Sequence, residues 1–137
     1  MKNLSIAIVG KLPGSALASH IANRMFKGRA PKGAQYPYIV YLLVTNNPEK
    51  TFTENFENPL LQFSCFSCLS SSDEVENIYD DLIALYDECS LSVAGYQWFH
   101  WMKRINENLN IEDHMVKNDT TQVWHYVIEY EIKMLAE

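Results

Sequence analysis

Residues 27–44, KGRAPKGAQYPYIVYLLV, constrain the fold of this chain more than any other segment. The segment begins with a loop rich in glycine and proline, because glycine admits positive φ and proline fixes its own φ and favours an extended residue before it. From Tyr38 onward the residues are aromatic, β-branched or apolar without a polar interruption, which predicts a strand covered on both faces. We therefore expect a central strand that begins at Tyr38.

This loop and strand resemble the lead-in of the small tail-completion proteins of long-tailed bacteriophages, which are similar to tail-terminator and head-to-tail joining proteins. In that family a short helical N-terminus ends in an arginine and a hydrophobic residue, and a Pro-Gly-Ala-Pro-Tyr loop leads into a strand. The matching residues here are Arg24, Met25, Pro31, Gly33, Ala34, Pro37 and Tyr38. The order of the later elements also agrees, so the resemblance covers most of the chain.

The resemblance implies a structural protein of a phage or prophage. It implies a hexameric ring of identical subunits that caps the tail tube and meets the head connector, at the head-proximal end of the tail. The protein would then belong to the virion tail or neck, and to the host cytoplasm during assembly. Its partners would be itself, the tail-tube protein and the head connector.

The length and charge of the chain narrow the function classes. We expect one domain over residues 1–137, which is long enough to bury a core. The 11 Lys and Arg against 17 Asp and Glu give a net charge of −6, which argues against direct nucleic-acid binding because phosphate contact needs a basic surface. No apolar run reaches the ~20 residues of a membrane span. We expect a soluble, intracellular protein without membrane contact, whose three cysteines form no disulfide framework.

Hydrophobic periodicity predicts three helices. Residues 4–12 form a short buried helix, and Ser15 caps a second helix that continues through Met25 to Gly28. The third and longest helix, residues 73–89, carries an apolar stripe and begins at a capping box formed by Ser71 and Glu74.

Period-two alternation predicts the strands. Residues 60–69 pair antiparallel with the strand at Tyr38, and residues 96–105 pair with a strand that begins near Thr121. Residues 45–58 and 109–116 are polar connections. The fold class is therefore α+β: an antiparallel sheet of about four strands, with one long helix packed on a face and short N-terminal helices.

Three groups of residues are candidates for an interface with another subunit or partner. The basic side chains of the glycine- and proline-rich loop either face an acidic neighbour or form an ordinary solvated loop. Two phenylalanines in a polar segment either dock on a neighbouring subunit or fold back over the sheet. A strand with aromatic residues on both faces suggests that a second face or an edge is buried by another subunit. The candidates are Lys27, Arg29, Lys32, Phe52, Phe56, Trp98 and Trp101.

Catalysis has no support in the sequence, so we expect no enzyme, cofactor or metal. Cys65 and Cys68 lie three apart on a strand and point to opposite faces, so they do not form a redox pair. His100 and His125 could face each other across the last two strands, but two imidazoles without a third ligand are no metal site. The alternative is a small ligand-binding or enzymatic α+β domain with an aromatic pocket lined by Tyr38, Tyr41, Trp98 and Trp101.

Overall fold

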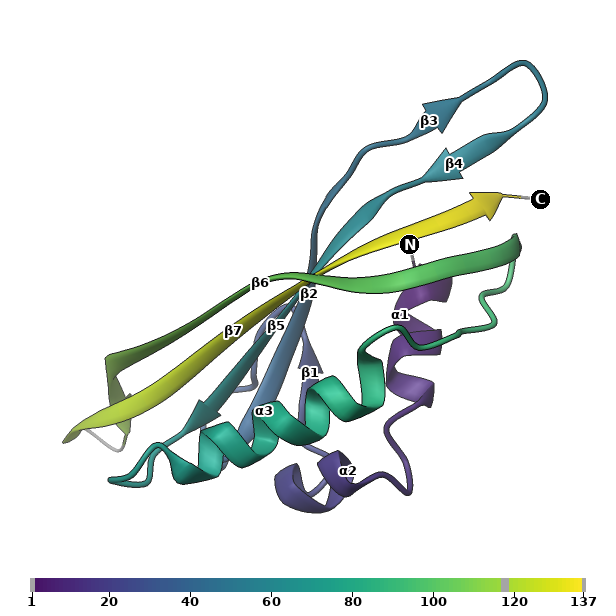
Figure 1. Cartoon of the computed structure of the whole chain (residues 1–137). Helices are drawn as coiled ribbons and strands as arrows, with labels where there is room; N and C mark the ends of the chain where they lie inside the picture. The colour runs from purple at the N-terminus through teal and green to yellow at the C-terminus, as the bar shows by residue number, and fades with distance from the viewer. Residues whose placement is uncertain (1, 117–118, 137) are drawn as a thin grey trace.

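The fold is one twisted sheet with three helices on one face (Figure 1). The computed structural model describes residues 2–116 and 119–136, without the side chains of 98–101 and 116. The elements are α1 (Lys2–Gly10), α2 (Ala16–Ile21), β1 (Met25–Lys27), β2 (Tyr38–Asn46), β3 (Glu49–Lys50), β4 (Asn55–Glu57), β5 (Pro59–Ser67), α3 (Asp73–Tyr86), β6 (Tyr96–Val116) and β7 (Asp119–Ala136).

The long strand β7 organises the sheet. β6 pairs antiparallel with one edge of β7. β5 and then β4 pair antiparallel with the other edge, and both keep the same register to β7. β2 pairs antiparallel with β5, and β1 adds to β2 as the one parallel neighbour in the described chain. Because β3 and β4 extend the β2–β5 pair, residues 38–67 form one long hairpin with a bulge near Val44.

The expected sheet of about four antiparallel strands with one long helix is wrong. Within the described residues the sheet has seven strands and is mixed, and the longest helix, α3, has 14 residues. One error came from Met25, whose four-residue spacing from Ile21 suggested a continuing helix. Ala22 and Asn23 instead adopt φ of 51° and 60°, which ends α2, and Met25 begins β1 opposite Ile39.

Two segments expected to be polar connections are strands. β3 and β4 lie within residues 45–58, and β6 runs without interruption through residues 109–116. Polar residues predominate in 45–58 because much of its surface faces water, which hides the period-two alternation of a buried strand. In 109–116 an alternation of apolar and polar residues is present but is interrupted at Asp113. The prediction that β5 pairs antiparallel with β2 is confirmed.

The core lies between the helices and one face of the sheet. The predicted stripe of α3 is confirmed, because Val75, Ile78, Leu82 and Tyr86 are fully buried. The helix ends at Tyr86 rather than at Cys89, and the expected capping box does not form. Glu74 instead accepts a hydrogen bond from Ser67 Oγ at 2.7 Å, which ties α3 to the end of β5.

The other face of the sheet carries no helix in the described chain, and we call it the open face (Figure 1). Val40 and Leu42 of β2 project from it, as do Ser64 and Phe66 of β5, since alternate residues share a face. Leu42 is 48% exposed, so the expectation that β2 is covered on both faces is wrong. The open face is thus the surface on which apolar side chains of the sheet meet solvent.

Candidate interaction surfaces

The lead-in loop, residues 28–37, is held against the sheet by Arg24. Its Nε donates to the carbonyl oxygen of Pro37 at 2.9 Å, and its Nη2 donates to that of Tyr36 at 3.3 Å. Gly28 and Gly33 adopt φ near +80°, and the amide of Ala34 donates to the carbonyl of Pro31 in a tight turn. The residues that carried the family resemblance therefore fix the path of this loop.

A chain of side-chain hydrogen bonds joins the lead-in loop to the far end of the β6–β7 hairpin. The carboxylate of Glu112 accepts from His125 Nδ1 at 2.7 Å and from His114 Nε2 at 3.0 Å. The Tyr36 hydroxyl lies 2.9 Å from His114 Nδ1, and the His125 ring stacks on Phe66. Burial alone would raise the pKa of Glu112, but the two imidazole hydrogen bonds and their charge lower it overall.

Sequence reasoning missed this network. It placed Glu112 and His114 in a connection, whereas both lie on β6, and it paired His125 with His100, whereas Asn110 lies opposite His125. The side chain of His100 lies outside the described part of the chain. The available signal of a strand was an alternation of apolar with polar residues, interrupted only at Asp113: Leu109, Ile111 and Met115 against Asn110, Glu112 and His114.

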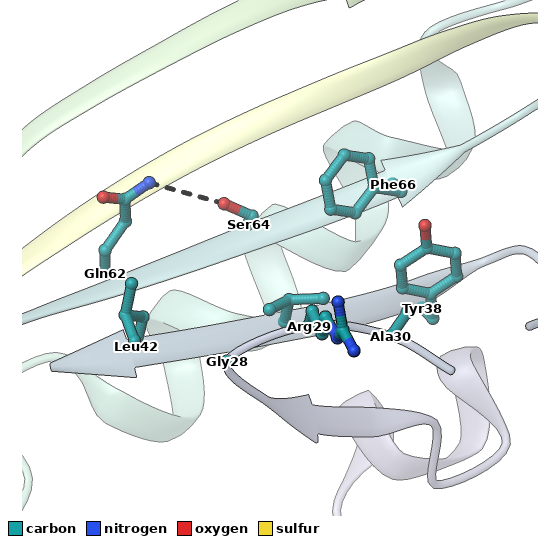
Figure 2. Close-up of a pocket in the computed structure, with 9 residues that line it drawn as sticks. Gly28, Arg29, Ala30, Tyr38, Leu42, Gln62, Ser64 and Phe66 are labelled. Atoms are coloured by element: carbon teal, nitrogen blue, oxygen red, sulfur yellow. Dashed lines mark hydrogen bonds between the residues drawn. The ribbon is translucent and has the colours of Figure 1, made fainter. Parts of the chain in front are cut away.

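The open face holds a pocket of about 380 Å³ beside Arg29, which we call the Arg29 pocket (Figure 2). Val40 and Leu42 of β2 and Phe66 of β5 supply apolar walls, and Tyr38 closes one end. Gln62 and Ser64 add polar groups to the sheet side, while Arg29 reaches over from the lead-in loop, as Figure 2 shows. This pocket is suited to an apolar group that arrives with a negative charge.

A second, wider hollow of about 900 Å³ lies between the lead-in loop and the end of β6. Its lining includes Lys32, Tyr36, Cys68, His114 and Met115. The side chains of Tyr36 and His114 form a hydrogen bond with each other, so both groups already have a partner.

The β3–β4 hairpin carries the two phenylalanines singled out from the sequence. Phe52 is fully exposed at its tip, so of the two alternatives considered for it, folding back over the sheet is excluded. Phe56 is half-buried on β4, with the ammonium of Lys133 4.9 Å from its ring centroid. The hairpin extends beyond the helices (Figure 1).

The predicted interface residues lie in three places on the fold. Lys27, Arg29 and Lys32 are all exposed on or beside the lead-in loop, and Phe52 and Phe56 belong to the β3–β4 hairpin. Trp98 and Trp101 lie on β6, where their backbones pair with Leu135 and Lys133; their side chains lie outside the described part of the chain. The interface role of all seven stays a prediction.

The alternative hypothesis of a ligand-binding or enzymatic domain placed Tyr38 and Tyr41 in one aromatic pocket, but the two side chains lie on opposite faces of the sheet. Tyr38 lies on the open face, whereas Tyr41, three residues on, points into the core. Burial, followed by the neighbouring Tyr36, raises the pKa of Tyr38 to about 12, so its hydroxyl stays neutral in ordinary buffers.

Of the two cysteines expected on one strand, only Cys65 lies on it, because β5 ends at Ser67. Cys65 is buried and Cys68 exposed, and both are free thiols. Burial raises the pKa of Cys65 well above its ordinary range. Among the residues with described side chains, no group of three or more His, Cys, Asp or Glu could hold a metal ion. None of the described helices is long and apolar enough to cross a membrane.

Comparison with known proteins adds a likeness of fold. No protein-family model matches this chain, and no curated protein matches it. The fold is similar to that of a chain in the solved virion of a native gene transfer agent particle, with a TM-score of 0.65. The match covers 95% of this chain and 94% of that chain at 11% sequence identity, so the two share a fold over nearly their whole lengths.

Proposed function

We propose that this chain is a structural protein of a phage, a prophage or a related particle. In this proposal it assembles into a hexameric ring at the head-proximal end of a tail, as a tail terminator or a head-to-tail joining protein. The observation that carries the proposal is the likeness of fold to a chain of a gene transfer agent virion, which spans 95% of this chain. The resemblance of the lead-in loop to tail-completion proteins supports the same role.

The surface of the molecule supports an assembling role rather than an enzymatic one. Phe52 at the hairpin tip is fully exposed, and Leu42 on the open face and Met115 near the end of β6 are 48% and 71% exposed. Large apolar side chains at several places on one small domain are typical of a protein that buries them against partners. In a ring, neighbouring subunits would cover some of these groups, and the tail-tube protein and head connector would cover others.

Size-exclusion chromatography with light scattering tests the proposal. Six protomers of 15.8 kDa give a particle of about 95 kDa, and negative-stain images should show rings. Proteomics of particles purified from the source should find the protein, and labelled antibody should mark the head-proximal end of the tail. A protein that stays strictly monomeric at every concentration, and is absent from such particles, would refute the proposed function.

A further inference from the structure

The turn at the tip of the β3–β4 hairpin holds Phe52 in a defined position. The amide of Thr51 donates to the carbonyl of Glu54 at 2.9 Å, and the Thr51 hydroxyl accepts from the amide of Glu54 at 3.0 Å. The base of the hairpin is fixed because Phe56 pairs with Leu135 of β7. A phenyl ring on an ordered turn loses little conformational entropy when it docks, so Phe52 is suited to be an anchor.

The Arg29 pocket has the size and lining that such an anchor needs. Its 380 Å³ exceed the volume of one phenyl ring, and Val40, Leu42 and Phe66 offer it apolar contact. Tyr38 and Phe66 have ring centroids 5.0 Å apart, so a third aromatic ring could pack against an existing pair. The Arg29 guanidinium beside the pocket could lie over an inserted ring or bind a carboxylate next to it.

The charges around tip and pocket are opposite. Residues 46–58 contain three glutamates and one lysine, whereas residues 24–37 contain four basic residues and no acidic one. Within the hairpin, Glu49 lies 3.9 Å from Lys133. Along the chain, Glu54 and Lys50 each lie two residues from Phe52, and the three glutamates and one lysine give residues 46–58 a net charge of −2. The hairpin would therefore be attracted to the basic surroundings of the Arg29 pocket.

The tip cannot reach the pocket of its own chain. Phe52 lies ten residues beyond Leu42, and at about 3.3 Å per residue the hairpin carries it roughly 30 Å away from the pocket. In Figure 1 the hairpin points away from β1 and the lead-in loop. The complementary pocket must therefore belong to another molecule.

We propose that Phe52 of one copy of this chain inserts into the Arg29 pocket of a second copy, with Glu54 beside Arg29. The inference rests on the proposed function, since it names the contact by which subunits of the ring would meet. Tip and pocket are different surfaces, so the contact is head-to-tail. Such contacts close into a ring when the rotation between neighbours permits it.

Substitutions at Phe52 test the anchor. Phe52→Ser should weaken association about tenfold or more, because the buried phenyl ring is lost, while Phe52→Leu should retain most of the affinity. Phe52 is fully exposed, so both variants should fold and melt like the wild type.

An exchange of charges gives a second test. Glu54→Lys and Arg29→Glu should each weaken association of the subunits, and a protein that carries both substitutions should associate like the wild type.

Cross-linking distinguishes this contact from others. In a Cys68→Ser background, which removes the exposed native thiol, one population carries Thr53→Cys and another carries Ala30→Cys. A short thiol cross-linker should link chains of the two variants when they are mixed. It should not link chains when either variant is treated alone. Joining of Thr53→Cys chains to each other would mean a tip-to-tip contact and would overturn the inference.

The outcomes separate the inference from the proposed function. If the wild type forms rings that Phe52→Ser leaves unchanged and the mixed populations do not cross-link, the ring stands and the tip contact is wrong. The tip would then serve another partner. A monomeric wild type overturns both.

Discussion

At the scale of single residues, a few hydrogen bonds fix how the elements of this protein meet. Tyr86 on α3 is fully buried, and its hydroxyl donates to the carbonyl of Ile8 at the end of α1 at 2.7 Å. Its ring stacks on Phe63 of β5, with centroids 4.9 Å apart. One side chain therefore joins two helices and the sheet.

We expect Tyr86→Phe to reduce the free energy of unfolding by about 1 kcal/mol, because it removes one buried hydrogen bond and keeps the ring. The loss should stay near that value because the Ile8 carbonyl also accepts from the amide of Lys11. Urea denaturation measures it. The control is Tyr126→Phe, which removes the same oxygen from a half-buried ring, and an equal loss in both variants would contradict the role of the Tyr86 hydroxyl.

The Glu112 network predicts a dependence of stability on pH. The folded state lowers the pKa of Glu112 below its ordinary value of 4.5, because the hydrogen bonds and charge of His125 and His114 outweigh burial. A lowered carboxyl pKa contributes stability that is present above the ordinary pKa and is lost as the pH falls through the folded value. Wild type should thus exceed Glu112→Gln in stability near neutral pH.

That difference should narrow as the pH falls below about 4.5, because the unfolded chain then binds a proton at Glu112 more readily than the folded protein does. Urea denaturation of both proteins across this range measures it. A difference that is constant down to about pH 3 would mean that ionised Glu112 is not stabilised by the two histidines.

At the scale of elements, the burial of each segment decided whether its sequence pattern could be interpreted. α3 and β5 each bury one continuous apolar set, and both were identified from the sequence. β3 and β4 bury no side chain fully, and their composition is that of a loop. The outer part of β6 exposes most of its side chains, so its apolar residues form no clear buried pattern. β1 has three residues and owes its conformation to pairing with β2, which no local pattern encodes.

The sequence reveals single exposed residues of the candidate surfaces but not the way in which they come together. The exposed phenylalanine and the cluster of basic residues are visible as composition, so Phe52 and Arg29 could be named from the sequence. The Arg29 pocket joins residues from the lead-in loop, β2 and β5, and the Glu112 network joins the lead-in loop, β6 and β7. Both depend on strand register, which the sequence did not supply.

The fully buried stripe of α3 predicts a large effect of truncation. Leu82→Ala should lower the free energy of unfolding by about 2–5 kcal/mol, because it removes buried methyl groups and leaves a cavity. Leu69→Ala is the matched control, since Leu69 is 54% exposed and the same truncation there should change stability by at most about 0.5 kcal/mol. Similar denaturation midpoints for Leu82→Ala and wild type would mean that the stripe is not core.

At the scale of the whole molecule, two electrostatic effects on assembly oppose each other. Each protomer carries a net charge of −6, so copies repel one another at long range, and added salt should relieve this repulsion. A contact between the acidic hairpin tip and the basic lead-in loop is attractive, and added salt should weaken it as the screening length falls from about 10 Å at 0.1 M to about 3 Å at 1 M. The sign of the salt dependence therefore reports which effect dominates.

If the lead-in loop meets an acidic neighbour, wild-type association should weaken as salt rises, because the attractive charges lie close together at the contact. Arg29→Glu with Lys32→Glu should associate more weakly than wild type at low salt and should gain affinity as salt is added. Light scattering at several ionic strengths measures both.

The matched control is Lys2→Glu with Lys103→Glu, which replaces two exposed lysines away from the loop. This control changes the net charge by the same amount, from −6 to −10. If both double variants respond to salt alike, the effect is one of net charge, and the lead-in loop serves only to connect the N-terminal helices and β1 to β2.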